Sequence, residues 1–297
     1  MKLLKTGKNV KTDLFNFSFS RSTTLLETSI KTNGLAQLPY GIVVHDSIQI
    51  YEGLKRYTIA LELGLDIDII VKELSIKEAF LEKIRMSSTK YNPIECAAIL
   101  TFANTHHIDY DLFIKYLGIN IENAAAYLKL LTLPLSIQQK TATEPEFLKV
   151  SQLLLPKHEK DILEIYDIII NYKLNINQSY ELCQIIDELR LKDASFKLDS
   201  LLNLEINSAN SAQEFMTHIK HIRYPNYMQL KSVLNNALKS IKSSHIRFDY
   251  KDNFESDEVS LTASIRAPQD IEKIISELET NKNVITKLLS IIKRGTH

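Results

Sequence analysis

The stretch YEGLKRYTIA, residues 51–60, decides how we expect the first third of the chain to fold. It stands between two strand-like apolar runs, and its second half is expected to be a helix. Gly53 lets the backbone approach a ligand closely, and the amide N–H groups at a helix start attract anions. Lys55 and Arg56 add positive charge at the same place. The stretch therefore predicts an anion site, with a solvated basic helix face as the alternative.

The composition favours helices over a glycine-rich α/β enzyme. The chain has 297 residues, enough for two or three domains, and it contains only 7 Gly and no Trp. Its 36 basic and 36 acidic residues give a net charge of zero. A protein whose affinity rests on phosphate contacts usually carries an overall positive charge, so any DNA-binding surface here must be a local basic patch.

The two cysteines predict a reducing compartment. Cys96 and Cys183 both lie in apolar helical contexts, which is typical of small core residues rather than of a disulfide. The N-terminus MKLLKTGKNVK lacks the apolar segment of a signal peptide, and no later run reaches membrane-spanning length. We expect a cytoplasmic protein.

Periodicity predicts a mainly α, multidomain chain. Residues 21–91 are expected to form a small α/β domain, in which apolar residues alternate along short strands. Its predicted strands lie near 42–44, 48–50 and 67–70, and its predicted helices near 25–30, 56–63 and 78–85. Residues 92–193 are expected to be all helix. Within them, Asp109 caps a helix and Gly118 makes the tight turn of a helix-turn-helix.

The C-terminal part predicts a separate α-β-β-α domain at 226–297, after a connection at 194–225. Its predicted elements are a helix at 230–241, strands at 246–250 and 259–265, a helix at 268–278 and a further helix at 284–292. A two-stranded hairpin is marginally stable alone and exposes an edge, so we predict a homodimer.

Several motifs, in order, resemble the ParB family of plasmid and chromosome partition proteins. They are SIKTNG at 29–34 followed by Gln37 and Pro39, EGLKRYTIA at 52–60, NPIE at 92–95, FIKYLG at 113–118 and YLKLLTLP at 127–134. The resemblance covers about residues 20–190. It implies a basic tail at 1–20 that engages a ParA-type ATPase, a nucleotide-type domain, a helix-turn-helix domain and a C-terminal dimerisation domain.

The resemblance implies that residues 21–91 bind CTP, with the triphosphate at the glycine-arginine box. The residues that correspond here are Gln37, Gly53, Lys55, Arg56 and Tyr57. Lys55 replaces an arginine of the family, which keeps the charge but loses the bidentate fork that suits phosphate.

The family's Mg²⁺-binding segment is altered in this sequence. Nine residues before Pro93, Ile84 replaces a glutamate and Arg85 replaces the next asparagine. Mg²⁺ needs hard oxygen ligands, which Ile84 lacks, and Arg85 repels a cation. We predict no metal site, no catalytic residues and no CTP hydrolysis, with weak or absent nucleotide binding. The alternative is an active CTP-dependent DNA clamp with oxygen ligands from Glu52 or Glu82.

The second helix of the predicted helix-turn-helix offers few base-reading side chains. Within INIENAAAY, residues 119–127, the candidates are Asn120, Glu122 and Asn123, and we add Lys129 beyond it. Three consecutive alanines read no base. One alternative is a helix-turn-helix kept for packing alone.

Together these features predict a divergent ParB-like adaptor, associated with the nucleoid or a plasmid, that binds DNA and a partner ATPase. The rivals are the active clamp and an interaction module that has lost both activities. The sequence disfavours a nuclease, because no carboxylate or histidine cluster in it suits a catalytic metal. His218 and His221 are expected to be an ordinary surface pair.

Overall fold

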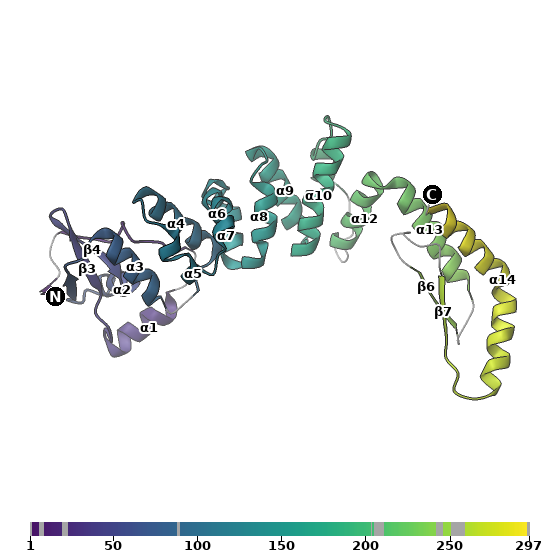
Figure 1. The fold of residues 1–297 in the computed structure, drawn as a ribbon, viewed down its shortest axis with the longest axis horizontal. Helices are drawn as coiled ribbons and strands as arrows, with labels where there is room; N and C mark the ends of the chain where they lie inside the picture. Colours follow the sequence, from purple (N-terminus) through teal and green to yellow (C-terminus); the bar gives the residue numbers. More distant parts are fainter. Residues whose placement is uncertain are drawn as a thin grey trace. The chain divides into compact units, whose positions relative to one another are not determined.

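The computed structural model describes residues 2–5, 9–19, 23–87, 90–202, 204, 211–241, 246–250 and 259–295. The chain divides into two compact units (Figure 1). The first comprises Met1–Gln184 and Lys197–Asn203, and the second comprises Ile185–Phe196 and Leu204–His297. The described part of the chain contains no helix with the length and apolar character needed to cross a membrane.

A five-stranded mixed sheet begins the first unit. Its spatial order is β1-β5-β3-β4-β2, with bounds β1 Lys2–Lys5, β2 Val10–Lys11, β3 Tyr40–Val44, β4 Ser47–Glu52 and β5 Asp68–Lys72. Strands β3 and β4 form an antiparallel hairpin, whose turn places His45 at a φ of 42°. Strand β5 returns parallel to β3. The central strands thus confirm the α/β prediction.

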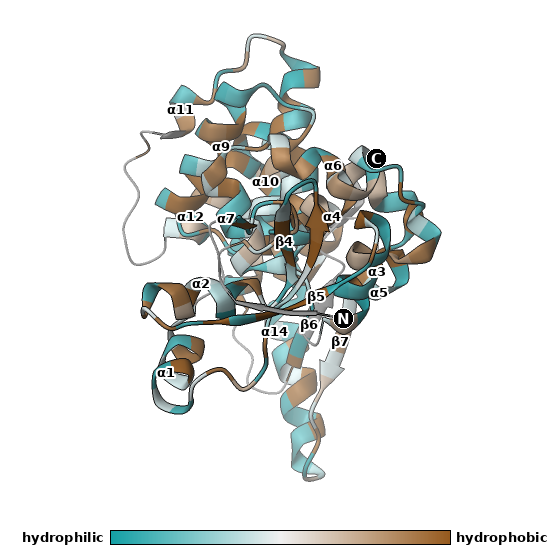
Figure 2. Ribbon diagram, turned by 90° about the vertical axis from the view of Figure 1, so that its left-hand side faces the viewer, coloured by the Kyte–Doolittle hydropathy of each residue, from teal (hydrophilic) through white to brown (hydrophobic). Residues whose placement is uncertain are grey.

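Helices cover both faces of the sheet. Helices α1 Thr24–Asn33 and α2 Leu54–Glu62 lie on one face, and α3 Ile76–Met86 and α4 Pro93–Thr105 lie on the other. Successive strand residues point to opposite faces, so Ile50 packs in the α1–α2 layer and its neighbour Tyr51 in the α3–α4 layer. Figure 2 shows the apolar colouring of β4 and α4. The Gly53 turn therefore lies where β4 leaves the sheet and α2 begins.

The prediction of a tail over residues 1–20 is wrong. Strand β1 pairs antiparallel with β5, and β2 pairs parallel with β4. Phe15 and Phe17 are buried, and their rings lie 5.4 and 5.3 Å from the ring of Phe102. Burying two aromatic rings against the α3–α4 layer stabilises this segment far more than its lysines favour solvent.

Helical segments follow α4, and the last long one, α10, runs from the first unit into the second. Their bounds are η1 Tyr110–Leu112, α5 Ile114–Leu117, η2 Ile121–Asn123, α6 Ala124–Lys129, η3 Leu130–Thr132, α7 Leu135–Thr143, η4 Pro145–Phe147, α8 Leu148–Leu154, α9 Glu159–Asn171, α10 Ile176–Lys192 and α11 Asp199–Leu202. Asn92 starts α4 with a capping box, in which its side chain accepts from the N–H of Glu95 and its own N–H donates back to that side chain. Cys96 and Cys183 are buried, as predicted for small core residues.

The second unit contains the α-β-β-α arrangement. Its elements, after the end of α10, are α12 Ser211–Arg223, α13 Pro225–Ser240, β6 Ile246–Tyr250, β7 Val259–Ala263 and α14 Gln269–Gly295. Leu234 and Ala237 of α13 pack against Leu288 and Ile291 of α14. The prediction of two separate final helices is wrong: α14 is one helix of 27 residues. No glycine or proline interrupts residues 279–283, so the amphipathic pattern continues through them.

Candidate functional site

Gly53 forms the turn on which the site is built. It adopts the left-handed conformation, with a φ of 78°, and α2 begins at the next residue. A Cβ at this position would lie 3.0 Å from Pro39 Cα and 3.2 Å from Arg56 Nη2. Both the backbone conformation and the close approach therefore require glycine.

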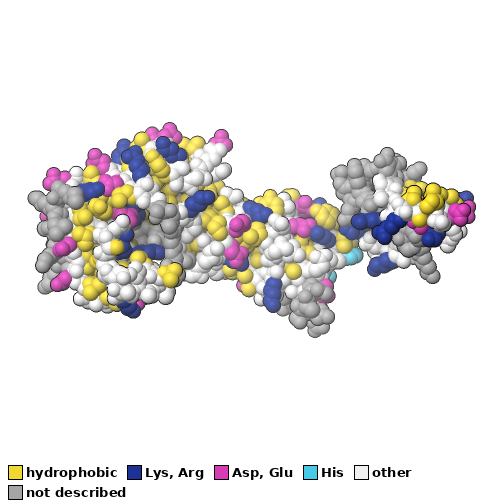
Figure 3. Space-filling model, turned by 90° about the horizontal axis from the view of Figure 1, so that it is seen from below, with side chains coloured by type: hydrophobic (Ala, Val, Ile, Leu, Met, Phe, Trp, Pro, Cys, Tyr) yellow, Lys and Arg dark blue, Asp and Glu magenta, His cyan; other side chains and the backbone are white. Residues whose placement is uncertain are grey.

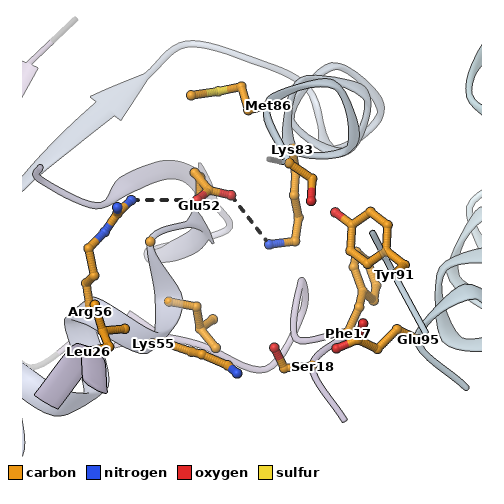
Figure 4. Close-up of a pocket in the computed structure, with 13 residues that line it drawn as sticks. Phe17, Ser18, Leu26, Glu52, Lys55, Arg56, Lys83, Met86, Tyr91 and Glu95 are labelled. Carbon is orange, nitrogen blue, oxygen red and sulfur yellow. Dashed lines mark ion pairs between the residues drawn. The ribbon is translucent and has the colours of Figure 1, made fainter. Parts of the chain in front are cut away.

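A cavity of about 250 Å³ opens beside this turn (Figure 4). Two helices supply its cations: Lys55 and Arg56 come from α2, and Lys83 comes from α3. The remaining wall includes Glu52, Glu95 and apolar or aromatic side chains, among them Phe17, Leu26, Met86 and Tyr91. Small-molecule sites usually occupy roughly 300–1,000 Å³, so this cavity suits the phosphate end of a ligand rather than a whole nucleotide.

Arg56 is fixed by neighbours on two sides. Its Nη1 donates to Gln37 Oε1 at 2.8 Å, and its Nη2 lies 3.6 Å from Glu52 Oε1. Its Nε is buried and finds no acceptor among the residues that the structure describes. A buried donor without an acceptor costs free energy, which the surrounding contacts of Arg56 must offset.

Lys83 was missed by the sequence predictions. Its side chain is only 13% exposed, and its Nζ donates to the carbonyl oxygen of Tyr51 at 2.8 Å and lies 3.8 Å from Glu52 Oε2. Burial lowers the pKa of Lys83, and the negative charges of Glu52 and Glu95 partly oppose this. The available signal was a lysine on the apolar stripe of the predicted helix 78–85, next to Ile84.

The carboxylates proposed as alternative metal ligands are already paired with cations. Glu52 lies between Arg56 and Lys83, as Figure 4 shows. Glu82 accepts from Tyr51 Oη at 2.8 Å and from Lys72 Nζ at 2.5 Å. Burial raises the pKa of Glu82, but these two hydrogen bonds outweigh it and hold that pKa below its usual value.

A metal ion therefore does not fit this site. Ile84 is buried at 2% exposure and offers no oxygen, and Arg85 is exposed and carries a positive charge. Within the described ranges, no three His, Cys, Asp or Glu side chains are grouped closely enough to hold a metal. In contrast, the groups around Gly53 suit an anion, because three cations line the cavity beside the N-terminus of α2.

The structure brings together most of the predicted nucleotide residues. Gly53, Lys55 and Arg56 line the cavity, and Gln37 is bonded to Arg56 from outside it. Tyr57 is a core residue instead: it is 5% exposed, and its N–H donates to the carbonyl of Gly53. Its place one residue beyond the cationic pair turns its side chain toward the α1–α2 layer, so its burial does not favour the ligand contact, which stays a prediction.

The predicted DNA-binding residues lie on an exposed surface around α6. Gly118 makes the turn at a φ of 69°, and Asn120 caps the segment by accepting from the N–H of Glu122 at 3.4 Å. Asn120, Glu122, Asn123 and Lys129 are all exposed, whereas Ala124 is buried. Three large apolar side chains are exposed nearby, Leu112, Tyr116 and Ile121. Figure 3 shows basic and acidic side chains interspersed over the face drawn.

No protein-family model matches the sequence, and no curated protein matches it. Matches among solved structures include two of the C-terminally truncated chromosome-partitioning protein ParB from Caulobacter crescentus. The one complexed to the centromeric parS site is 16% identical with a TM-score of 0.36, over 60% of this chain and 96% of that chain. The one complexed with CTP-gamma-S is 18% identical with a TM-score of 0.26, over 55% and 99%. At these identities and TM-scores the matches do not assign the chain to a family.

Proposed function

We propose that this chain is a ParB-like partition adaptor whose first unit binds the triphosphate of CTP without hydrolysing it. The observation that carries the proposal is the cavity at Gly53, where Lys55, Arg56 and Lys83 converge on the N-terminus of a helix. Positive charge and outward N–H groups at a helix start are the chemistry that recognises phosphate. The cations and the helix start around this cavity support nucleotide binding more strongly than the sequence alone did.

The proposal excludes turnover because phosphoryl transfer relies on metal ions and on a group that orients the nucleophile. The position expected to carry the family's glutamate is the buried Ile84, and the neighbouring Arg85 is a cation. Incubation of the full chain with CTP, with and without Mg²⁺, is expected to release no inorganic phosphate above a protein-free control. Measurable release would favour the clamp interpretation instead.

DNA binding belongs to the same proposal through the surface around α6. The turn at Gly118 and the exposed Asn120, Asn123 and Lys129 support contact with a DNA duplex. The paucity of base-reading side chains favours binding with little sequence preference. A nucleoid or plasmid would be its location, and a ParA-type ATPase remains the proposed protein partner.

A homodimer through the second unit completes the proposal. The β6–β7 ladder has two strands, and Leu261 and Ile265 are exposed on or beside β7. Pairing with a second copy would cover such residues. Light scattering of the full chain is expected to give twice the 34.1 kDa chain mass, and Leu261→Asp is expected to weaken the dimer. A monomer at all concentrations would contradict this part.

Titration calorimetry tests the nucleotide site. The full chain is expected to bind CTP in preference to GTP and ATP, and Arg56→Ala is expected to weaken binding about tenfold or more, the loss of a charge-assisted hydrogen bond. Arg85→Ala is the matched control, since this exposed arginine belongs to the same unit but does not line the cavity. The proposal fails if no nucleotide binds, or if both variants lose equal affinity.

A second candidate function is a protein-interaction module. It is favoured by one observation, the exposure of Leu112, Tyr116 and Ile121 at 38%, 45% and 48% beside the helix that would read DNA. Apolar side chains at that place suit a protein surface better than a phosphate backbone. Failure of the full chain to bind duplex DNA at low salt would favour this candidate.

A further inference from the structure

Lys83 is a mostly buried cation that the resemblance to a known family does not explain. It stands on the inner face of α3, where Ala79, Phe80 and Ile84 are buried in the core. A lysine is seldom buried unless a partner or a function holds it there. Its 13% exposure and its position in the wall of the Gly53 cavity call for a role in that cavity.

The ammonium group of Lys83 is held in place by the protein itself. The carbonyl oxygen of Tyr51 accepts from Nζ at 2.8 Å, which fixes the group beside the end of β4. The ammonium also lies 5.9 Å from the centre of the Phe17 ring. These two contacts, together with the Glu52 carboxylate 3.8 Å from Nζ, fix the ammonium group at the cavity wall, so it is preorganised to face an entering anion.

Glu52 holds its two cationic neighbours loosely. Its Oε1 is 3.6 Å from Arg56 Nη2, and its Oε2 is 3.8 Å from Lys83 Nζ. Both separations exceed a hydrogen bond, so the carboxylate neutralises charge without saturating the donors. Phosphate oxygens that entered the cavity would therefore find N–H groups on both cations still able to donate.

The same arrangement disfavours the binding of a divalent metal ion. Each oxygen of Glu52 faces a cation, and Glu95 accepts from the N–H of Phe19 at 3.2 Å and from the N–H of Asn92 at 3.0 Å. A divalent ion placed among these residues would meet the ammonium of Lys83 at close range and would be repelled. The cavity thus already contains a fixed cation that can face an entering phosphate.

We propose that Lys83 takes the place of a divalent metal, so that this cavity binds the triphosphate group of a nucleotide in its metal-free form. The inference rests on the proposed nucleotide-binding function and deepens it by naming the state of the ligand. Lys55, Arg56 and Lys83 outnumber Glu52 and Glu95 in the cavity wall, which leaves it positive toward an entering anion. Mg²⁺ bound to the triphosphate would reduce the ligand's charge and weaken its attraction to these three cations.

The test is calorimetry of the full chain with CTP and with inorganic triphosphate, each in EDTA and in excess Mg²⁺. The affinity in EDTA is expected to equal or exceed the affinity in Mg²⁺. Lys83→Met, which keeps the length of the side chain and removes its charge, is expected to weaken metal-free binding about tenfold or more. Lys77→Met is the control, because Lys77 is an exposed lysine on the same helix α3.

Each other outcome has a defined meaning. Binding that is about tenfold weaker in EDTA than in Mg²⁺ overturns the role of Lys83 but leaves nucleotide binding intact. Metal-free binding by Lys83→Met at the wild-type affinity overturns it as well. No binding by the wild type in either condition overturns both proposals. Should Lys83→Met not fold, the comparison of wild-type affinities in EDTA and in Mg²⁺ still tests the proposal. Lys83→Arg, which keeps the charge, is expected to keep metal-free binding.

Discussion

Two glycine turns of the first unit share a backbone conformation but present different chemistry. Gly53 and Gly118 both adopt left-handed conformations, at φ values of 78° and 69°, and both precede helical segments. Around Gly53 the side chains are cations and carboxylates that line a cavity. Around Gly118 they are exposed amides, alanines and apolar residues. The turn sets where a helix begins, and the side chains beyond it decide whether the place binds a ligand.

Replacing each of these two glycines with alanine is expected to give the largest difference between the turns, measured as the free energy of unfolding. Gly53→Ala forces a left-handed alanine against Pro39 Cα at 3.0 Å, so the free energy of unfolding should fall by about 3 kcal/mol. Gly118→Ala meets nothing within 4 Å and should lose only the conformational term, about 1–2 kcal/mol. Urea denaturation measures both. Equal losses would mean that the close approach at Gly53 is not a constraint on the fold.

The alanines after Gly118 sharpen the comparison, because one of them has a clear packing role. Ala124 is 4% exposed and packs in the cluster that includes Cys96 and Leu100 of α4, whereas Ala125 is exposed. Ala124→Leu overpacks this contact and should lower the free energy of unfolding by about 2 kcal/mol. Ala125→Leu should change it by less than about 0.5 kcal/mol. Thermal unfolding of the pair checks this, and a neutral Ala124→Leu would rule out the packing role.

The sequence predicted well the features that local chemistry controls. The strand at Ser47–Glu52 follows from alternation, and the helical character of residues 92–105 follows from apolar periodicity. The Gly53 turn and its two cations were likewise predicted from ten consecutive residues. In these cases each residue's partner lies within a few positions along the chain, so one sequence contains the evidence.

The features that were missed depend on distant partners. Strand β1 is only four residues long, and it forms because β5, more than sixty residues away, offers it an edge. Phe15 is buried by Phe102, and Lys83 is held by the carbonyl of Tyr51. A pattern of side chains does not indicate which backbone carbonyl will lie beside a given lysine, so the most informative residue of the cavity could not be predicted.

Glu52→Gln is expected to raise the affinity of the cavity for anions. The substitution removes a negative charge that lies 3.6 and 3.8 Å from the two cations while keeping the side-chain shape. We expect the affinity for triphosphate to rise about three- to tenfold, since charge repulsion is only partly screened in a half-buried site. Glu62→Gln, at the exposed end of the following helix α2, is the control. A lower affinity for triphosphate in Glu52→Gln would instead mean that Glu52 positions the cations.

The smallest expected effect concerns the surface after Gly118, the second of the two turns compared. Lys129→Ala removes one exposed cation beside α6, so the affinity for duplex DNA should fall about three- to fivefold and the slope of log K against log salt should fall by about 1. Lys160→Ala, an 81% exposed lysine on α9, is the control. Fluorescence anisotropy over a salt series measures both. Equal losses for the two variants would indicate binding by general charge. Because Lys129 is the one cation among the four predicted DNA contacts, such a result would leave the surface after Gly118 without a role in DNA binding and would favour a protein partner for its exposed apolar residues.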